Sequence, residues 1–170
     1  FINVEKSPLL KKYSIDNKKK IVIFTSVPYF DKIGRVDAAL SNNEYVKFIK
    51  CFYKAAKELT DVQFVVKPHP NENPDIHQEM LRRHAKNGNL ILMEQEVDTF
   101  ELIYISDLLI TFHSTSGLEA VLLDKPVITV NLTGRPDPAD YAEKGVAIGV
   151  YKGKNLYYAI NNALYNEDVC

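Results

Sequence analysis

A single histidine stands between two prolines in the segment Lys67-Pro68-His69-Pro70-Asn71. The prolines restrict the backbone on both sides of the imidazole, and the segment follows a short apolar run that is typical of a buried strand. An ordinary loop histidine is solvated and binds nothing. Its place after a buried strand favours a ligand role for His69, either as a hydrogen-bond donor to a phosphate or as an acid or base.

A second segment runs from another apolar stretch into hydroxyls, a glycine and a helical pattern. Its polar residues are His113, Ser114, Thr115, Ser116, Gly117 and Glu119. Backbone N–H groups at the start of a helix, the positive end of its dipole and the hydroxyls would converge on one point, which suits a phosphate. The same residues also fit a capping box, in which Ser116 caps the helix and Glu119 reaches back. For Glu119, capping and binding of a ribose hydroxyl are equally supported and do not exclude each other.

A third segment, residues 131–140, offers one guanidinium after a further apolar run. This group belongs to Arg135, and an arginine fork suits the oxygens of a diphosphate. The alternative is a surface arginine that pairs with Asp137 or Asp140, and the support for this is equal.

Metal and nucleic-acid binding find little support in the sequence. His77 and His84 share one face of a predicted helix but lack a third ligand, so we interpret them as surface or packing residues. The two cysteines, Cys51 and Cys170, have no metal-binding spacing. Lys and Arg total 21, Asp and Glu total 22, and the net charge of -1 leaves no basic field for a nucleic acid. We therefore expect no metal, no cofactor and no nucleic acid.

Six short apolar runs alternate with helical patterns and predict the architecture. The predicted strands are residues 21–27, 62–66, 90–93, 108–112, 127–130 and 146–150, and the predicted helices lie within 45–59, 76–84, 100–105, 118–123 and 156–164. Such alternation implies right-handed crossovers. The sequence thus predicts an α/β fold, a Rossmann-like doubly wound parallel sheet of about six strands with helices on both faces. Its ligands would bind in the strand-to-helix loops, among them 28–43, 67–74 and 94–98.

The two ends of the chain suggest how this domain is bounded. Residues 1–19 have no regular pattern and are interpreted as a linker or interdomain segment, and residues 20–170 as the domain. The first residue is Phe, which suggests a piece of a longer protein. The first 20 residues have no signal-peptide pattern, and the apolar runs are too short for a membrane span. With few cysteines, the composition suits the cytoplasm.

From about Lys20 onward, the order of these motifs resembles the C-terminal, nucleotide-binding half of GT-B-type enzymes. In the capsule and surface polysaccharide transferases, together with the CDP-glycerol glycerophosphotransferase and bacterial polysialyltransferase type, a KPHP-like motif and a later S-T-x-G-x-E-A motif bind the phosphates of the nucleotide. Residues 67–70 and 114–120 match these two motifs. The resemblance implies that His69 and residues 114–117 contact phosphate and that Glu119 contacts the ribose or the sugar.

The sequence is also similar to the non-hydrolysing UDP-N-acetylglucosamine 2-epimerases. These have an HPN-type segment, a D-S-G-G-x-x-E-E loop and a T-E-R-P-E segment. Residues 69–71 fit the first and residues 133–137 fit the last in part, which would place Arg135 on the diphosphate. The sequence departs from the epimerases at the glycine pair, where it has Thr115 and Ser116, and at the second glutamate, where it has Ala120.

The resemblance implies the donor-binding domain of a nucleotide-sugar or CDP-alcohol dependent transferase in cell-surface polysaccharide biosynthesis. Its substrate would be a UDP- or CDP/CMP-linked donor, with His69 as the catalytic group. The residues expected to bind substrate are Lys67, His113, Ser114, Thr115, Ser116, Gly117, Glu119 and Arg135. Because the acceptor domain of such enzymes is a separate N-terminal half, we expect this chain alone to be inactive. We expect its parent protein to be cytoplasmic and able to associate peripherally with a membrane. The alternatives are an epimerase-type domain and a non-catalytic nucleotide-binding or assembly domain.

Overall fold

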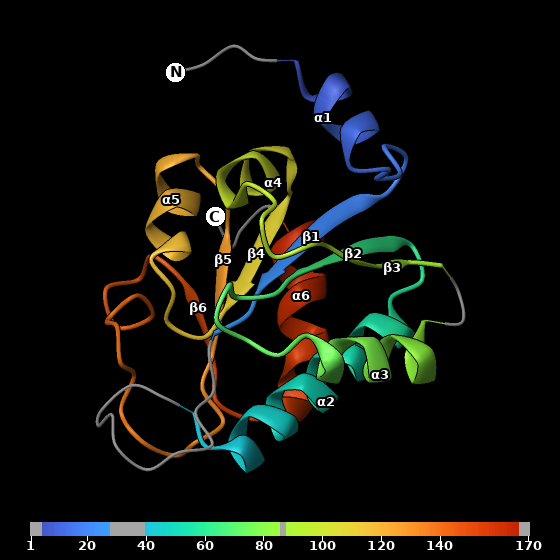
Figure 1. The fold of residues 1–170 in the computed structure, drawn as a ribbon. Coiled ribbons are helices and arrows are strands. Elements are labelled where there is room, and N and C mark those ends of the chain that lie inside the picture. The colour runs from blue at the N-terminus through green and yellow to red at the C-terminus, as the bar shows by residue number, and fades with distance from the viewer. Residues whose placement is uncertain (1–4, 28–39, 86–87, 167–170) are drawn as a thin grey trace.

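A parallel sheet of six strands forms the centre of the computed structural model, which describes residues 5–27, 40–85 and 88–166 (Figure 1). The strands are β1 (Lys20–Thr25), β2 (Val62–Lys67), β3 (Leu90–Leu92), β4 (Leu108–Thr111), β5 (Val127–Val130) and β6 (Ile148–Val150). Their order in the sheet is β3-β2-β1-β4-β5-β6. Each predicted strand is therefore confirmed, and the fold is Rossmann-like. Most of the loop at 28–43 lies outside the described residues.

Helices cover both faces of this sheet, as predicted. One face carries α2 (Asn42–Glu58), α3 (Asp75–His84) and α6 (Leu156–Tyr165), which follows a short 3-10 helix, Gly153–Asn155. The other face carries α1 (Lys6–Lys12), α4 (Thr99–Ile105) and α5 (Ser116–Leu122). The sheet and its two helical layers therefore enclose two separate apolar cores.

Alternation along β1 shows how the strands feed both cores. Val22 and Phe24 face α2, whereas Ile21 and Ile23 face the opposite layer. The Phe24 ring lies 5.1 Å from the Phe48 ring, centroid to centroid, in an edge-on arrangement. Burial of each such side chain contributes roughly 1.5–3 kcal/mol, which anchors the end of β1 that the site uses.

The segment interpreted as a linker contains a helix that packs on the domain. Leu9 and Leu10 of α1 contact the second core, and Lys12 forms an ion pair of 2.6 Å with Glu101 of α4. Pro8 lies in the first turn of α1, where a missing N–H costs little. No regular apolar pattern marks this helix, because it has only seven residues.

The strand order places a switch point between β1 and β4. From β1 the chain moves outward to β2 and β3, and it then returns to pair β4 with the other side of β1. After β1 the chain continues to α2 on one face of the sheet, and after β4 it continues to α5 on the other, so the switch point lies at the carboxyl ends of these two strands. In open α/β sheets, ligands bind at this place.

Candidate functional site

The end of β1 holds both predicted phosphate-binding segments at the switch point. The hydroxyl oxygens of Thr25 and Ser116 lie 2.9 Å apart in a hydrogen bond. The next residue, Ser26, accepts a hydrogen bond of 2.8 Å from the backbone N–H of His69. The structure thus brings the loop of His69 and the start of α5 to the end of the same strand.

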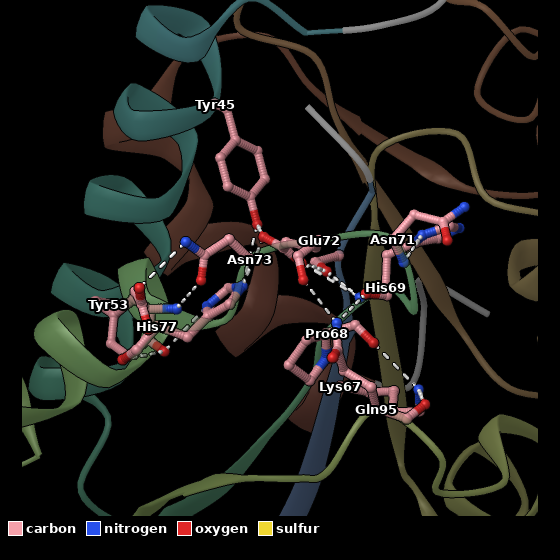
Figure 2. A network of polar contacts seen from close by, with 12 residues as sticks. Tyr45, Tyr53, Lys67, Pro68, His69, Asn71, Glu72, Asn73, His77 and Gln95 are labelled. Carbon is pink, nitrogen blue, oxygen red and sulfur yellow. Dashed lines mark hydrogen bonds and ion pairs between the residues drawn. The ribbon is translucent and has the colours of Figure 1, made fainter. Parts of the chain in front are cut away.

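Backbone carbonyls and two long side chains hold the His69 loop, residues 67–74. The side-chain amide of Gln95 donates to the carbonyls of His69 and Glu72, at 2.6 and 2.7 Å. The ammonium of Lys67 donates to the carbonyls of Pro68 and Gln95, at 3.1 and 2.6 Å (Figure 2). Lys67 is buried, and this burial lowers its pKa. Its observed contacts fasten the loop, and its contact with a substrate stays a prediction.

The His69 imidazole is held in one tautomer. Its Nδ1 accepts a hydrogen bond of 3.1 Å from the backbone N–H of Asn71, so the proton of the neutral ring lies on Nε2. Burial, together with the nearby Lys67 ammonium, lowers the pKa of His69. The half-buried ring therefore presents an Nε2–H donor at neutral pH.

A buried polar network lies behind this loop and was not predicted. Glu72 accepts hydrogen bonds from Ser26 and Tyr45, and His77 lies 3.1 Å from its Oε1 (Figure 2). His77, interpreted as a surface or packing residue, is fully buried and also contacts the hydroxyl of Tyr53 at 3.3 Å. The two tyrosines lie eight residues apart on one apolar face of α2, and this was the only local signal in the sequence.

The turn of residues 114–117 leads from β4 into α5. The Ser114 hydroxyl accepts a hydrogen bond of 3.3 Å from the N–H of Ser116, and the Ser114 carbonyl accepts one of 3.0 Å from the N–H of Gly117. Helix α5 has Thr115 as its N-cap, with no side-chain cap bond. The capping box of Ser116 and Glu119 is therefore wrong, because Ser116 lies inside the helix and its hydroxyl bonds to Thr25. A role of Glu119 on a ribose stays a prediction.

Tyr141 covers this turn, and the sequence did not single it out. A Cβ added to Gly117 would lie 2.9 Å from Cε2 of the Tyr141 ring, so glycine leaves room for the ring. The Tyr141 hydroxyl donates to the Ser114 carbonyl at 3.3 Å, and burial raises the pKa of this tyrosine. The His113 ring lies 4.7 Å from the Phe112 ring at the end of β4, and Thr115 is exposed.

Arg135 is paired, but not with the partners considered. Its Nη2 lies 3.0 Å from Oε2 of Glu44, which is in the first turn of α2. Asp137 instead accepts hydrogen bonds from Asn131 and Tyr151, at 2.8 and 2.6 Å. The pairing of Arg135 with Asp137 or Asp140 is therefore wrong. Asp140 forms its ion pair with a neighbouring lysine at 3.5 Å.

A surface pocket of about 590 Å³ adjoins this third segment. It is lined by Arg135, Pro136, Asp137, Asp140, Ala142, Glu143, Gly149 and Tyr151. The Arg135 side chain is half exposed, with 54% of its surface accessible. Arg135 therefore lines a surface pocket, and its contact with a diphosphate stays a prediction.

In the described part of the chain, no three His, Cys, Asp or Glu side chains gather closely enough to hold a metal ion. None of the helices described is both long and apolar enough to cross a membrane.

Solved structures with a similar fold include both transferases and an epimerase. The E. coli ADP-heptose lipopolysaccharide heptosyltransferase II superimposes with a TM-score of 0.71 at 16% identity, over 99% of this chain and 53% of the other. S. aureus MnaA, solved with UDP, gives 0.68 at 21% identity, over 99% and 42%. The UDP-GlcNAc 2-epimerase of Neisseria meningitidis, bound to UDP-GlcNAc, gives 0.68 at 18% identity, over 99% and 42%.

These similarities show the fold of one half of a GT-B enzyme, and this chain spans roughly two fifths to half of the length of these structures. A search of the curated proteins found no match. A family model described as "Capsule polysaccharide biosynthesis protein" matches residues 4–146. Since this match covers most of the sequence, the chain belongs to the capsule polysaccharide biosynthesis protein family.

Proposed function

We propose that the chain is the donor-binding domain of a transferase that builds cell-surface polysaccharide from a nucleotide-activated sugar or a CDP-linked alcohol. One observation carries this proposal: the His69 loop and the 114–117 turn are both bonded to the end of β1, at the switch point of the sheet. The family match supports the link to capsule synthesis, and the UDP-bound neighbours support a nucleotide donor.

The groups at this point suit the phosphates of such a donor. His69 offers an Nε2–H donor, Ser114 and Thr115 offer hydroxyls, and the positive end of the α5 dipole lies at the same turn. In both chemistries the leaving group is a nucleotide phosphate, on which negative charge builds as its bond to the transferred group breaks. Hydrogen-bond donors that are already in place stabilise this charge.

Within this proposal His69 acts as a donor to the leaving phosphate and not as a base. Its Nδ1 already accepts the N–H of Asn71, and its lowered pKa keeps the ring neutral at physiological pH. A neutral ring with Nε2–H can donate a hydrogen bond without first gaining a proton. Removal of this donor is expected to weaken phosphate binding and any turnover of the longer protein.

Arg135 is proposed to reach the second phosphate of a diphosphate. To do so it would leave Glu44, and this costs little because exposed ion pairs contribute about 0–1 kcal/mol. The acceptor site is proposed to lie outside this chain, since the similar solved structures are about twice as long.

An epimerase-type function is the second candidate. It is favoured by the UDP-GlcNAc 2-epimerase among the similar folds and by the placement of residues 133–137 beside a pocket. It predicts a preference for UDP and UDP-GlcNAc over cytidine nucleotides. A transferase with a CDP-linked donor would instead prefer cytidine nucleotides over UDP and UDP-GlcNAc.

Thermal unfolding with UDP, CDP, CMP and UDP-GlcNAc tests the proposal. A nucleotide at ten times its Kd should stabilise the chain by about 1.4 kcal/mol and raise Tm by roughly 3 to 5 °C. The rise should be lost in His69→Ala and Ser114→Ala and kept in His84→Ala, a control histidine on α3. A chain that no nucleotide stabilises, or an equal rise in His69→Ala, would contradict the proposal.

A further inference from the structure

The loop that carries His69 is folded around a buried carboxylate. The side chain of Glu72 is fully buried, and its Oε2 accepts hydrogen bonds from the Ser26 hydroxyl and, at 3.2 Å, from the backbone N–H of His69. Its Oε1 accepts from Tyr45 and lies 3.1 Å from Nε2 of His77. A buried carboxylate is costly unless it is fully hydrogen-bonded, and here both oxygens have donors.

The protons of this network can be assigned consistently. The Tyr53 hydroxyl lies 3.3 Å from Nδ1 of His77 and can donate to it, which leaves Nε2–H to point at Glu72. The hydroxyl of Tyr45 then donates to the same carboxylate oxygen. In this arrangement every donor that faces Glu72 has an acceptor.

The same carboxylate controls the peptide of His69. The His69 N–H is shared between the Ser26 hydroxyl at 2.8 Å and Glu72 Oε2 at 3.2 Å, while the N–H of Glu72 donates back to the His69 carbonyl at 2.9 Å. The turn closed in this way brings the N–H of Asn71 to Nδ1 of the imidazole. The peptide orientation and the ring tautomer therefore depend on the same set of bonds.

We propose that Glu72, acting through Ser26 and the His69 peptide, is a positioning residue that directs the Nε2–H of His69 toward the donor phosphate. This inference rests on the proposed function, in which that Nε2–H binds phosphate. Glu72 does not touch the substrate. Its effect reaches the ligand only through the orientation of the imidazole.

Binding of CDP and UDP to the full 170-residue chain and its variants tests this role. Glu72→Met removes both acceptors at similar volume, and Ser26→Ala removes the nearest acceptor of the His69 N–H with a smaller change in packing. Both variants are expected to raise, by about tenfold, the Kd of whichever nucleotide the parent chain binds. Glu72→Gln keeps one oxygen able to accept the His69 N–H, and it should restore the Kd to within about threefold of the parent value.

Tyr53→Phe is the matched control. Tyr53 meets the network at His77, on the side away from the His69 loop, so its loss should lower stability and leave the Kd within about twofold. A tenfold loss of affinity in Tyr53→Phe would show that any loosening of the network has this effect. That result would overturn a specific role for Glu72.

A second measurement needs no ligand and separates the two proposals. The imidazole ¹⁵N spectrum of His69 should show the Nε2–H tautomer in the parent chain and in Glu72→Gln, and a mixture of tautomers in Glu72→Met and Ser26→Ala. An unchanged tautomer in those two variants would overturn the positioning role, whether or not nucleotides bind. Failure of the parent chain to bind any nucleotide would instead count against the proposed function, and the tautomer would still decide the role of Glu72.

Discussion

The His69 loop and the 114–117 turn meet at one strand end but are held in different ways. The loop presents a side chain, and buried side chains fix it: Glu72 and Ser26 behind it and Gln95 beneath it. The turn presents the hydroxyls of Ser114 and Thr115; its N–H groups at Ser116 and Gly117 are bonded to Ser114, and Tyr141 packs over its surface. A binding group on a loop side chain thus needs a buried support, whereas a binding group at a helix start is held by the bonds of the turn itself.

The largest expected effect breaks the support of the loop. Glu72→Met leaves the hydroxyls of Ser26 and Tyr45 and the Nε2–H of His77 without their carboxylate acceptor, and each such group costs about 1–3 kcal/mol. We expect the free energy of unfolding to fall by about 3 kcal/mol or more in urea denaturation. Glu119→Met, the same change in α5 at a half-exposed position, should alter it by less than about 0.5 kcal/mol. Equal losses would remove the contrast between the two regions.

A smaller loss is expected when the hydroxyl that caps the turn is removed. Ser114→Ala deletes the acceptor of the Ser116 N–H and should cost about 1 kcal/mol of unfolding free energy. Thr115→Ala serves as the control, since this residue caps α5 by position without a side-chain bond, and it should cost under about 0.5 kcal/mol. If Thr115→Ala were the more damaging change, the assignment of the capping hydroxyl would be wrong.

The contact between Gly117 and Tyr141 predicts that Gly117→Ala destabilises the parent chain but stabilises a chain that lacks the Tyr141 ring. In the parent chain, Gly117→Ala pushes a methyl group against the tyrosine ring and should destabilise by about 0.5–1 kcal/mol. In a Tyr141→Ala background the same substitution should stabilise by up to about 1 kcal/mol, because alanine favours the helix over glycine. The two pairs of unfolding curves form a double-mutant cycle. Additive effects would show that the ring does not restrict this turn.

The smallest effect on stability is expected at Arg135. Its ion pair with Glu44 is exposed, so Arg135→Ala should change the free energy of unfolding by less than about 0.5 kcal/mol. We expect the same variant to raise the Kd of CDP or UDP about tenfold and to leave that of CMP, which has a single phosphate, nearly unchanged. Titration calorimetry would measure both, and an equal loss for CMP would exclude a selective contact with the second phosphate.

The sequence predicted the strands and the binding segments of the site, but not the contacts that hold these segments in place. The strands were predictable because they are short β-branched runs, and His69 and residues 114–117 because prolines and a glycine mark them. Three contacts that hold the site were not predictable, because they join residues far apart in the chain. Tyr45 and Glu72 are 27 residues apart, Tyr141 and Ser114 also 27, and Arg135 and Glu44 are 91 apart. No local pattern reports such pairs.

In the proposed function, the His69 loop and the 114–117 turn together form a nucleotide phosphate site. The most direct test is a titration of the ¹⁵N-labelled chain with CDP and with UDP, followed by backbone amide shifts. We predict that the amides of His69 and of residues 114–117 shift together, with one affinity and ahead of amides elsewhere. Shifts confined to other parts of the chain, such as the surroundings of Tyr151, or no shifts with either nucleotide, would contradict a phosphate site at this place.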